Sequence, residues 1–473
     1  MKNISERIFD VVSREFSVKI DKISHDTGPG DLAKWDSLGS LRLVMSIEKE
    51  FNIQLSIDDV VAINSIKDLV GVVSALVQGE KLDFDDITKS ATSTQVADVL
   101  RVPNIIYCGE GSLNSIKSME FDSVAVILGS SLYAEEIIDK VNGLIDKNIK
   151  FQKFIRPAGE PKESDIKNLA SKLIDFSPKQ ILAIGGGSTI DIAKLAWLIY
   201  EKPDFKLDDS STTIQELGLR KKASFIAIPT TFGSGSEASS SAAYTRNNES
   251  KKTILVSHDF LPDKVILDPT LGLSSSNEIL FSGAFDALTH AIEGYVSIVD
   301  KPFLNPMAIM AIKEIFKALN NIKNKNTDIK VLETLCNAAY HAGIVQNHCS
   351  VGLTHSFAHQ LTAHGVSHGT GNAMFLNPVI EYNSKRSEKY KVLVEEIGFN
   401  SVKDLMDHIS LIFNKSQICP NQNTIKNIIK NKSSIIEATM KDITFRTNPV
   451  EPSKAEVEAI FDHTMKKIVD NEY

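Results

Sequence analysis

The hydrophobic positions of the first 80 residues repeat at helical spacing. One apolar face is formed by Ile4, Ile8, Val11, Val12 and Phe16. Such a repeat predicts an amphipathic helix. A second helix is predicted to open at Asp36-Ser37-Leu38 and to continue to Phe51, and shorter patterns surround residues 57–61 and 66–77. We therefore predict a small four-helix unit over residues 1–79.

The pattern breaks down between Gly79 and about Val99, where charged, Ser and Thr residues dominate. We interpret residues 80–101 as a linker. If it behaves as a flexible coil of about 20 residues, its ends lie roughly 25 Å apart. A linker of that length lets the small unit move relative to the rest of the chain.

From residue 102 to about 270, apolar runs alternate with helical patterns. Continuous apolar runs cover residues 124–128, 180–184 and 225–228, and a strand-like segment covers 151–155. This βαβ alternation is typical of a parallel, doubly wound α/β sheet. After about residue 275 only long helical patterns remain. We predict an α/β domain over 102–272 and an all-helical domain over 273–473.

The composition is that of a folded globular protein. Of 473 residues 42% are hydrophobic, and 52 Lys+Arg against 60 Asp+Glu give a net charge of −8 without a basic tract. This balance argues against a nucleic-acid partner. No run reaches the roughly 20 apolar residues that span a bilayer, the N-terminus lacks a secretory signal, and four scattered cysteines indicate no disulfide framework. We expect a cytoplasmic, multidomain enzyme with no membrane partner.

A glycine turn follows the predicted strand at 180–184. Residues 185–191 (GGGSTID) are followed by helix-forming sequence. Consecutive glycines let the backbone approach a phosphate, and the helix N-terminus offers free N–H groups and a positive dipole end. A second polar run, residues 228–237 (IPTTFGSGSE), leaves the next strand. Together the two runs predict a dinucleotide site.

Seven of the 11 histidines lie between residues 290 and 368. Asp286 and His290 are four residues apart, as are His355 and His359, so each pair shares one face of a helix. His368 follows in a Gly-flanked loop. One carboxylate and three of these four imidazoles would form a ligand set suited to Fe²⁺ or Zn²⁺, with room for a substrate oxygen.

Five segments in this order, GGGSTID, PTTFGSGSE, FDALTHAIEGY, GLTHSFAHQL and VSHG, resemble the iron-containing (group III) alcohol dehydrogenases. The resemblance covers residues 102–473 and implies a dehydroquinate synthase-like fold, with a nucleotide-binding α/β domain before an all-helical metal domain. The metal ligands that it implies are Asp286, His290, His355 and His368. It places His359 beside the metal without ligating it. The spacing makes His359 the candidate catalytic residue that supplies a proton, and a water chain is the alternative. It also suggests a homodimer.

The same resemblance implies the cofactor contacts. They are Gly185, Gly186, Gly187, Ser188, Asp191, Thr230, Thr231, Ser234 and Lys252. Members that prefer NAD resemble one another in carrying Asp after the second strand, where this chain has Gly129. A carboxylate there repels a 2′-phosphate, so Gly129 leaves both NADPH and NADH open as cofactors. A further departure lies at residues 159–161, on the adenosine side, where Gly-Glu-Pro replaces the more usual Asn-Pro.

The N-terminal unit resembles an acyl carrier protein in its Asp-Ser-Leu opening the second of four helices. The resemblance implies that Ser37 accepts 4′-phosphopantetheine, which brings in a phosphopantetheinyl transferase and acyl-loading enzymes as partners. A phosphate at a helix N-terminus is also favoured by the helix dipole. Residues 1–80 hold 13 acidic and nine basic side chains, a net −4, which suits a domain passed between basic surfaces.

We therefore expect a metal-dependent, NAD(P)H-linked alcohol dehydrogenase or aldehyde reductase fused to a carrier domain, in a secondary-metabolite or acyl-modification pathway. Its substrate is a carbonyl compound, either free or tethered to the carrier. One alternative is a non-redox lyase of the dehydroquinate synthase type, which would not consume NAD(P)H. The other is an inactive carrier scaffold, which would hold no metal.

Overall fold

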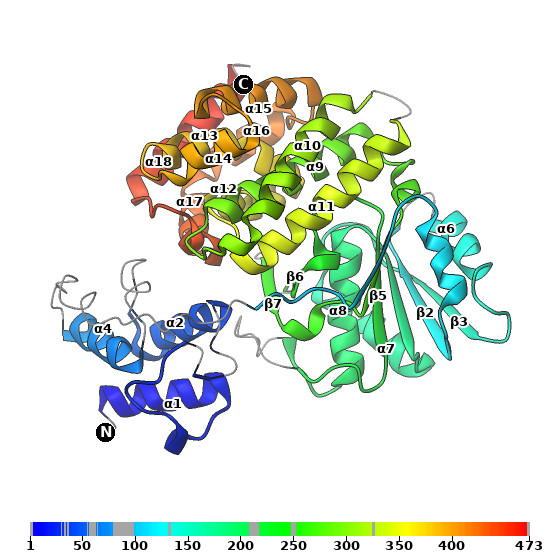
Figure 1. Cartoon of the computed structure of the whole chain (residues 1–473), viewed down its shortest axis with the longest axis horizontal. Helices are drawn as coiled ribbons and strands as arrows, with labels where there is room; N and C mark the ends of the chain where they lie inside the picture. The colour runs from blue at the N-terminus through cyan, green and yellow to red at the C-terminus, as the bar shows by residue number, and fades with distance from the viewer. Residues whose placement is uncertain are drawn as a thin grey trace. The chain divides into compact units, whose positions relative to one another are not determined.

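The computed structural model describes residues 3–29, 31–32, 35, 37–53, 55, 63, 65–78, 99–130, 134–207, 217–246, 252–323 and 327–470. These residues form two compact units, one up to Leu100 and one from Arg101 onward (Figure 1). The first unit has one hydrophobic core and the second unit has two, with no core residue shared between the units, and we describe the units separately. Among the described residues no helix is long and apolar enough to cross a membrane.

The first unit is helical, as the hydrophobic repeat predicts. Its described helices are α1 (Ile4–Phe16), the 3₁₀ turn η1 (Ile20–Lys22), α2 (Ser37–Phe51) and α4 (Ile66–Gln78). Asn3 and Glu6 form a capping box that starts α1. The core includes the ring of Trp35, stacked on Phe16 at 5.1 Å. The predicted third helix near residues 57–61 lies outside the described residues, as does the linker up to residue 98.

The second unit contains a six-stranded sheet in which every neighbouring pair is parallel, in the order β1-β8-β5-β4-β2-β3. The strands are β1 (Ile105–Cys108), β2 (Ser123–Leu128), β3 (Lys150–Ile155), β4 (Gln180–Gly185), β5 (Ser224–Pro229) and β8 (Lys264–Leu267). Four of them, β2 to β5, confirm the apolar runs seen in the sequence. The edge strand β1 and its neighbour β8 were not predicted.

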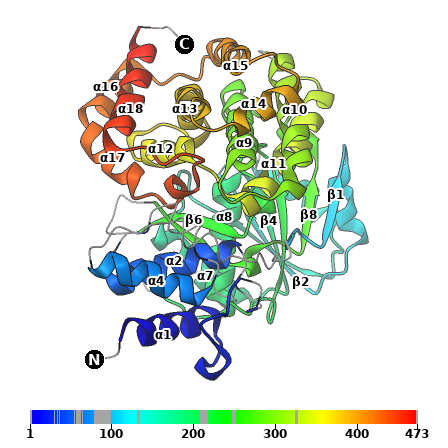
Figure 2. The ribbon, with the colours of Figure 1, turned by 60° about the vertical axis from the view of Figure 1, so that its left-hand side comes forward.

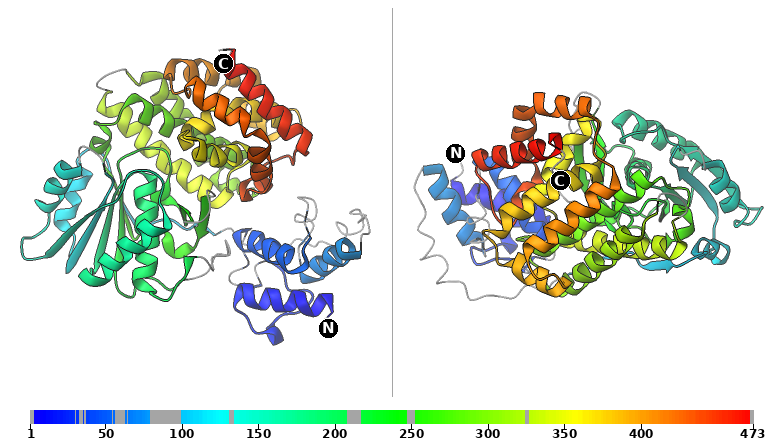
Figure 3. Two further views of the ribbon diagram at one scale, coloured as in Figure 1. Left: turned by 180° about the vertical axis from the view of Figure 1, so that it is seen from behind. Right: turned by 90° about the horizontal axis from the view of Figure 1, so that it is seen from above.

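Helices cover both faces of this sheet (Figures 2 and 3). Successive side chains of a strand point to opposite faces, so Ala125 and Ile127 join the core that contains α7 (Glu163–Phe176) and α8 (Gly187–Glu201). Val124 and Val126 join the second core, with α6 (Ala134–Asn142) and η3 (Ser112–Ser118). The predicted doubly wound arrangement is confirmed.

A short antiparallel hairpin, β6 (Ser241–Thr245) and β7 (Lys252–Val256), follows β5 and was not predicted from the sequence. Between β5 and this hairpin lies the segment 230–240, which includes the 3₁₀ turn η5 (Ser236–Ala238). We call residues 230–240 the serine loop. It leaves the carboxyl end of β5 and leads to β6.

The remainder of the unit is helical, as predicted. Its α-helices are α9 (Asn277–Val296), α10 (Asn305–Asn321), α11 (Ile329–Cys349), α12 (Leu353–Leu361), α13 (His368–Ser384), α14 (Lys389–Ile397), α15 (Val402–Ser416), α16 (Gln422–Lys430), α17 (Lys432–Met440) and α18 (Lys454–Val469). Short 3₁₀ turns lie between them, of which η10 (Ile443–Thr447) matters below. Buried residues of α9 and α11 share one core with the sheet.

Candidate metal centre and nucleotide site

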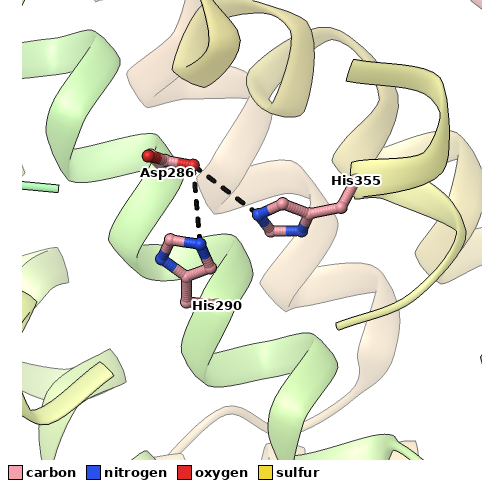
Figure 4. Close-up of side chains that lie close together, drawn as sticks. All are labelled: Asp286, His290 and His355. Carbon is pink, nitrogen blue, oxygen red and sulfur yellow. Dashed lines mark ion pairs between the residues drawn. The ribbon is translucent and has the colours of Figure 1, made fainter. Parts of the chain in front are cut away.

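Three histidines surround one carboxylate oxygen in the helical part. Asp286 and His290 lie one turn apart on α9, His355 comes from α12, and His368 begins α13. The Nε2 atoms of His290, His355 and His368 lie 3.8, 3.6 and 3.4 Å from Asp286 Oδ1. Figure 4 shows the imidazoles of His290 and His355 both facing this carboxylate. The structure thus brings together all four residues that the resemblance implies as ligands.

Burial and charge make this cluster suited to a cation. The ligand atoms of Asp286, His290 and His355 lie within 4.8 Å of one another, and all three residues are buried. Burial lowers the pKa of His290 to about 4, which leaves its ring neutral at pH 7. Burial would raise the pKa of Asp286, but His368, His290 and His355 together hold it well below its usual range. An ionised carboxylate facing imidazole nitrogens is the donor set of a divalent metal.

Glu293, which sequence reasoning missed, orients His355 from behind. Its Oε2 lies 2.7 Å from His355 Nδ1, so that Nε2 faces the cluster. The same carboxylate accepts hydrogen bonds from the backbone N–H groups of Gly352 and Thr354 at the start of α12, both at 2.7 Å. Burial opposes ionisation, but the hydrogen bonds to Asp286 and Glu293 raise the pKa of His355 to about 9. Such outer carboxylates commonly fix metal-binding histidines.

A second residue that the sequence did not reveal is Asn372 on α13. Its side-chain amide donates a 2.7 Å hydrogen bond to Asp286 Oδ1. Asp286 is therefore held from the side of α13 as well as by its own helix. The signal for Glu293 was present in the sequence, because it lies seven residues after Asp286 on the same helical face; Asn372 carried no comparable signal.

His359 lies next to the cluster but is bonded to a different carboxylate. Its Nδ1 is 2.9 Å from Asp442 Oδ2, and its ring stacks on that of His368 at 5.2 Å. Asp442 caps η10 and also accepts from the Thr444 N–H and hydroxyl, at 3.0 and 2.8 Å. Although burial acts the other way, His359 and these bonds lower the pKa of Asp442. An ionised Asp442 keeps a proton on Nδ1 and turns Nε2 away from itself.

Two other histidines of the crowded segment make contacts elsewhere. His348 accepts a 2.9 Å hydrogen bond from the Arg101 N–H, and His364 contacts Asn427 at 3.3 Å. Neither takes part in the Asp286 cluster. The crowding of histidines thus indicated the segment that holds the cluster. Helical spacing and the family resemblance then indicated which of its histidines lie at Asp286.

The glycine turn lies at the carboxyl end of β4 and opens α8. A Cβ atom on Gly186 would lie 2.8 Å from Thr231 Oγ1, and one on Gly187 would lie 2.6 Å from Ser234 Oγ. Neither position has room for a side chain. The turn and the serine loop therefore touch directly, and they bring Thr231 and Ser234 to the free N-terminus of α8. The backbone N–H of Thr230 also donates to Gly185 O at 3.1 Å.

Other predicted cofactor residues lie around this junction. Asp191 binds the Ser236 hydroxyl and accepts from the Ala243 N–H at 3.0 Å, so its carboxylate faces the serine loop. Ser188 is in the first turn of α8. Gly129 follows β2, the neighbouring strand, and a Cβ there would lie 3.0 Å from Thr189 Oγ1. Lys252 begins β7, but its side chain and that of Ser37 are outside the described residues.

The serine loop is fixed on two sides. On one side, the fully buried Lys194 of α8 donates hydrogen bonds to the carbonyl oxygens of Ser236, Ser239 and Ser241 at 2.7, 2.8 and 3.0 Å. On the other side, the backbone of the loop packs directly against the backbones of α9 and α11. A Cβ on Gly233 would lie 2.5 Å from Gly283 Cα of α9, and one on Gly235 would lie 2.5 Å from Gly343 Cα of α11. The loop therefore links the nucleotide site to the helix that carries Asp286 and His290.

Comparison with known proteins agrees with this geometry. The family model described as iron-containing alcohol dehydrogenase matches residues 103–269, and the model for the C-terminal part of that family matches residues 281–465. Residues 6–73 match the model described as phosphopantetheine attachment site. The N-terminal carrier resemblance is thereby confirmed.

Individual proteins similar to this chain are also alcohol dehydrogenases. An NADPH-dependent butanol dehydrogenase of Clostridium saccharobutylicum is 32% identical over 379 residues, which are 76% of this chain and 96% of the relative. An alcohol dehydrogenase of Thermococcus barophilus is 31% identical over 75% of this chain and 96% of its own length. The crystal structure of an iron-containing alcohol dehydrogenase from Thermococcus thioreducens, 26% identical, superimposes with a TM-score of 0.72, over 78% of this chain and all of that one. The chain, with its N-terminal phosphopantetheine-attachment domain, belongs to the iron-containing alcohol dehydrogenase family.

Proposed function

We propose that the chain is a metal-dependent aldehyde reductase and alcohol dehydrogenase that uses NADPH. The observation that carries this proposal is the convergence of three imidazole Nε2 atoms on Asp286 Oδ1 at 3.4 to 3.8 Å. Asp286, His290, His355 and His368 would hold Fe²⁺ or Zn²⁺. A metal there supplies Lewis acidity to a carbonyl oxygen.

NADPH is supported by two independent points. The butanol dehydrogenase described above is named as NADPH-dependent, and Gly129 leaves no carboxylate to repel a 2′-phosphate. The nicotinamide supplies the hydride. In this proposal the N-terminus of α8 binds the pyrophosphate, and Thr230, Thr231, Ser234 and Lys252 contact the remainder of the cofactor.

The protein's own side chains would orient the metal ligands and donate a proton to the substrate. Glu293 and Asn372 hold His355 and Asp286 in place, which sets where the carbonyl oxygen lies. His359 gives a proton from Nε2 to the oxygen of the reduced carbonyl, while Asp442 stabilises the charged ring through Nδ1. The balance is one aldehyde, one NADPH and one proton giving one alcohol and NADP⁺.

The decisive experiment follows NADPH oxidation with the metal-loaded full chain and a short aliphatic aldehyde. We expect NADPH and aldehyde to be consumed in equal amounts. His355→Ala should lose both metal and activity, whereas His364→Asn, outside the cluster, should keep both. A metal-loaded protein that converts no aldehyde and consumes no NADPH would contradict a redox function and favour the lyase alternative. A protein that binds no metal would favour the scaffold alternative.

The carrier unit extends the proposal to tethered substrates. Ser37 lies at the first position of α2, where we place the 4′-phosphopantetheine, added by a phosphopantetheinyl transferase and then loaded by acyl-transferring enzymes. Tethering would raise the local concentration of a scarce carbonyl intermediate. We also propose that the protein is a homodimer in the cytoplasm. Intact mass spectrometry should find one phosphopantetheine on the wild type and none on Ser37→Ala; an unmodified wild type coexpressed with a transferase would contradict the carrier role.

A further inference from the structure

Arg156 occupies a special position at the carboxyl end of the sheet. It directly follows β3, and its backbone N–H donates to Leu128 O at 2.9 Å, which extends the β2–β3 pairing by one residue. Since Leu128 pairs with Ile155, the extended pairing sets Arg156 opposite Gly129. The side chain of Phe154, two residues earlier, lies in the core formed with α7 and α8. By the alternation of a strand, Arg156 projects to that same face.

A side chain at position 129 would project to this same face of the sheet. A Cβ there would lie 3.0 Å from Thr189 Oγ1 in the first turn of α8. A side chain on residue 129 would crowd the first turn of α8, so glycine here places no carboxylate beside the strand end where Arg156 lies. In sheets of this kind a dinucleotide lies across the carboxyl ends of the strands, with its pyrophosphate on the helix N-terminus and its adenosine ribose over the next strand. That next strand is β2.

Arg156 is buried, yet its hydrogen-bonding capacity is not used up. The residue is only 8% exposed. One amino group donates to Gly159 O, but the buried Nε has no hydrogen-bond partner among the described residues. Burial lowers the pKa of Arg156, whereas the negative charges of Glu160, Asp165 and Asp191 raise it. A buried guanidinium with an unpaired donor is costly unless an anion binds it.

We propose that Arg156 binds the 2′-phosphate of NADPH and is the residue that makes this chain select NADPH over NADH. A guanidinium matches a phosphate with two parallel N–H donors. With glycine at position 129 there is no carboxylate to repel the 2′-phosphate. Arg156, opposite Gly129 on the neighbouring strand, supplies a positive charge instead. This inference rests on the proposed function, because it assumes that a dinucleotide binds along these strand ends.

The competing role for Arg156 is purely structural. Its bond to Gly159, whose φ of +94° marks a tight turn, fixes the segment that departs from the family at residues 159–161. A structural role predicts that replacing Arg156 weakens every nucleotide by the same factor. A 2′-phosphate contact predicts that only ligands with that phosphate are affected.

Isothermal titration of the full chain with 2′,5′-ADP and with 5′-AMP separates the two roles. The wild type should bind 2′,5′-ADP more tightly, and the difference should shrink with salt. Arg156→Met should weaken 2′,5′-ADP binding by about 10- to 100-fold, the range for a hydrogen-bonded charge pair, and leave 5′-AMP binding unchanged. Arg156→Lys, which keeps the charge and much of the packing, should fall between the two. Lys153→Met on the same strand, an exposed partner of Glu135, is the matched control.

The outcomes distinguish this inference from the proposed function. Equal weakening of both ligands, or no change in either, overturns the role of Arg156. A wild type that binds 5′-AMP as tightly as 2′,5′-ADP but oxidises NADH with an aldehyde overturns the inference and leaves the reductase intact. A wild type that binds neither nucleotide contradicts the nucleotide site itself.

Discussion

Two buried carboxylates, Glu293 and Asp442, contact histidines that lie far from them along the chain. Glu293 meets His355 across 62 positions, and Asp442 meets His359 across 83. The sequence could reveal the ligands themselves, because Asp286 and His290 are one helical turn apart and share one helix. It could not reveal Asp442, since nothing local marks which carboxylate the fold brings to His359.

Asp442→Asn tests the orientation of His359. The amide cannot hold a positive charge on the imidazole through Nδ1. We therefore expect kcat to fall by about 10-fold or more, up to the roughly 10²- to 10⁴-fold that general acid–base catalysis contributes. Metal content should stay constant, as measured by elemental analysis. Asp462→Asn, an exposed partner of Lys432, should change neither. Full turnover in Asp442→Asn would remove the pair from the mechanism.

Glu237 in the serine loop gives a pH-dependent contribution to stability. Burial, together with the charge of Asp191, raises the pKa of this carboxyl from 4.5 to about 7, although a backbone hydrogen bond and Lys194 act in the opposite direction. Between those two pH values the unfolded chain ionises while the folded chain keeps the proton. The stability from this group is therefore complete below about pH 4.5 and is lost as the pH rises through about 7.

Glu237→Gln keeps the uncharged form at every pH, so it should become more stable relative to the wild type as the pH increases from 5 to 8. Urea unfolding midpoints at the two pH values measure this difference. Glu278→Gln, an exposed residue of α9, should follow the wild type. Parallel pH profiles for Glu237→Gln and the wild type would show that the carboxyl is ionised in the folded protein throughout.

At the scale of elements, hydrophobic runs located the inner strands and the long helices, but they missed β1, β8 and the β6–β7 hairpin. The edge strand β1 is largely exposed, so it shows no continuous apolar run. The hairpin strand β6 alternates buried and half-buried positions and contains Ser and Thr, so it lacks a continuous apolar run as well. Contacts between glycines were equally invisible, because they depend on which elements the fold brings together.

Gly283→Ala tests the backbone contact between α9 and the serine loop. The added methyl group would lie 2.5 Å from Phe232 O, so helix and loop must separate. Overpacking of this kind costs about 1–3 kcal/mol, and we expect a lower unfolding midpoint together with weaker NADPH binding. Gly143→Ala, whose new Cβ would be 3.4 Å from its nearest neighbour, should show neither effect. Unchanged NADPH binding in a destabilised Gly283→Ala would separate packing from cofactor binding.

At the scale of the whole molecule, the separate cores of the two units explain why the sequence could predict the division into carrier and enzyme. Core residues of the first unit such as Ile8, Trp35 and Leu69 form a cluster among themselves. The catalytic unit instead shares one core between sheet and helices, so no hydrophobic pattern marks a boundary at the predicted residue 272. That boundary stays a prediction.

A chain limited to residues 99–473 should reduce free aldehydes with the kcat of the full protein, since its core and its candidate site are complete. NADPH consumption with free and with carrier-loaded aldehyde compares the two uses. Ser37→Ala should match the wild type on free aldehyde and lose turnover of tethered substrate. A large loss of free-aldehyde activity in residues 99–473 would show that the first unit contributes to catalysis directly.

Lys194 offers a consequence of a different kind. Its ammonium group makes hydrogen bonds to three carbonyl oxygens in a side chain with no solvent exposure. Ammonium hydrogens of exposed lysines exchange with water too quickly to give sharp magnetic resonance signals, whereas those of Lys194 should persist. Burial lowers its pKa to about 8, so the signal should be present at pH 6 and fade above pH 8. The protein thus carries a natural spectroscopic reporter of the serine loop, one that needs no label near the metal or the cofactor.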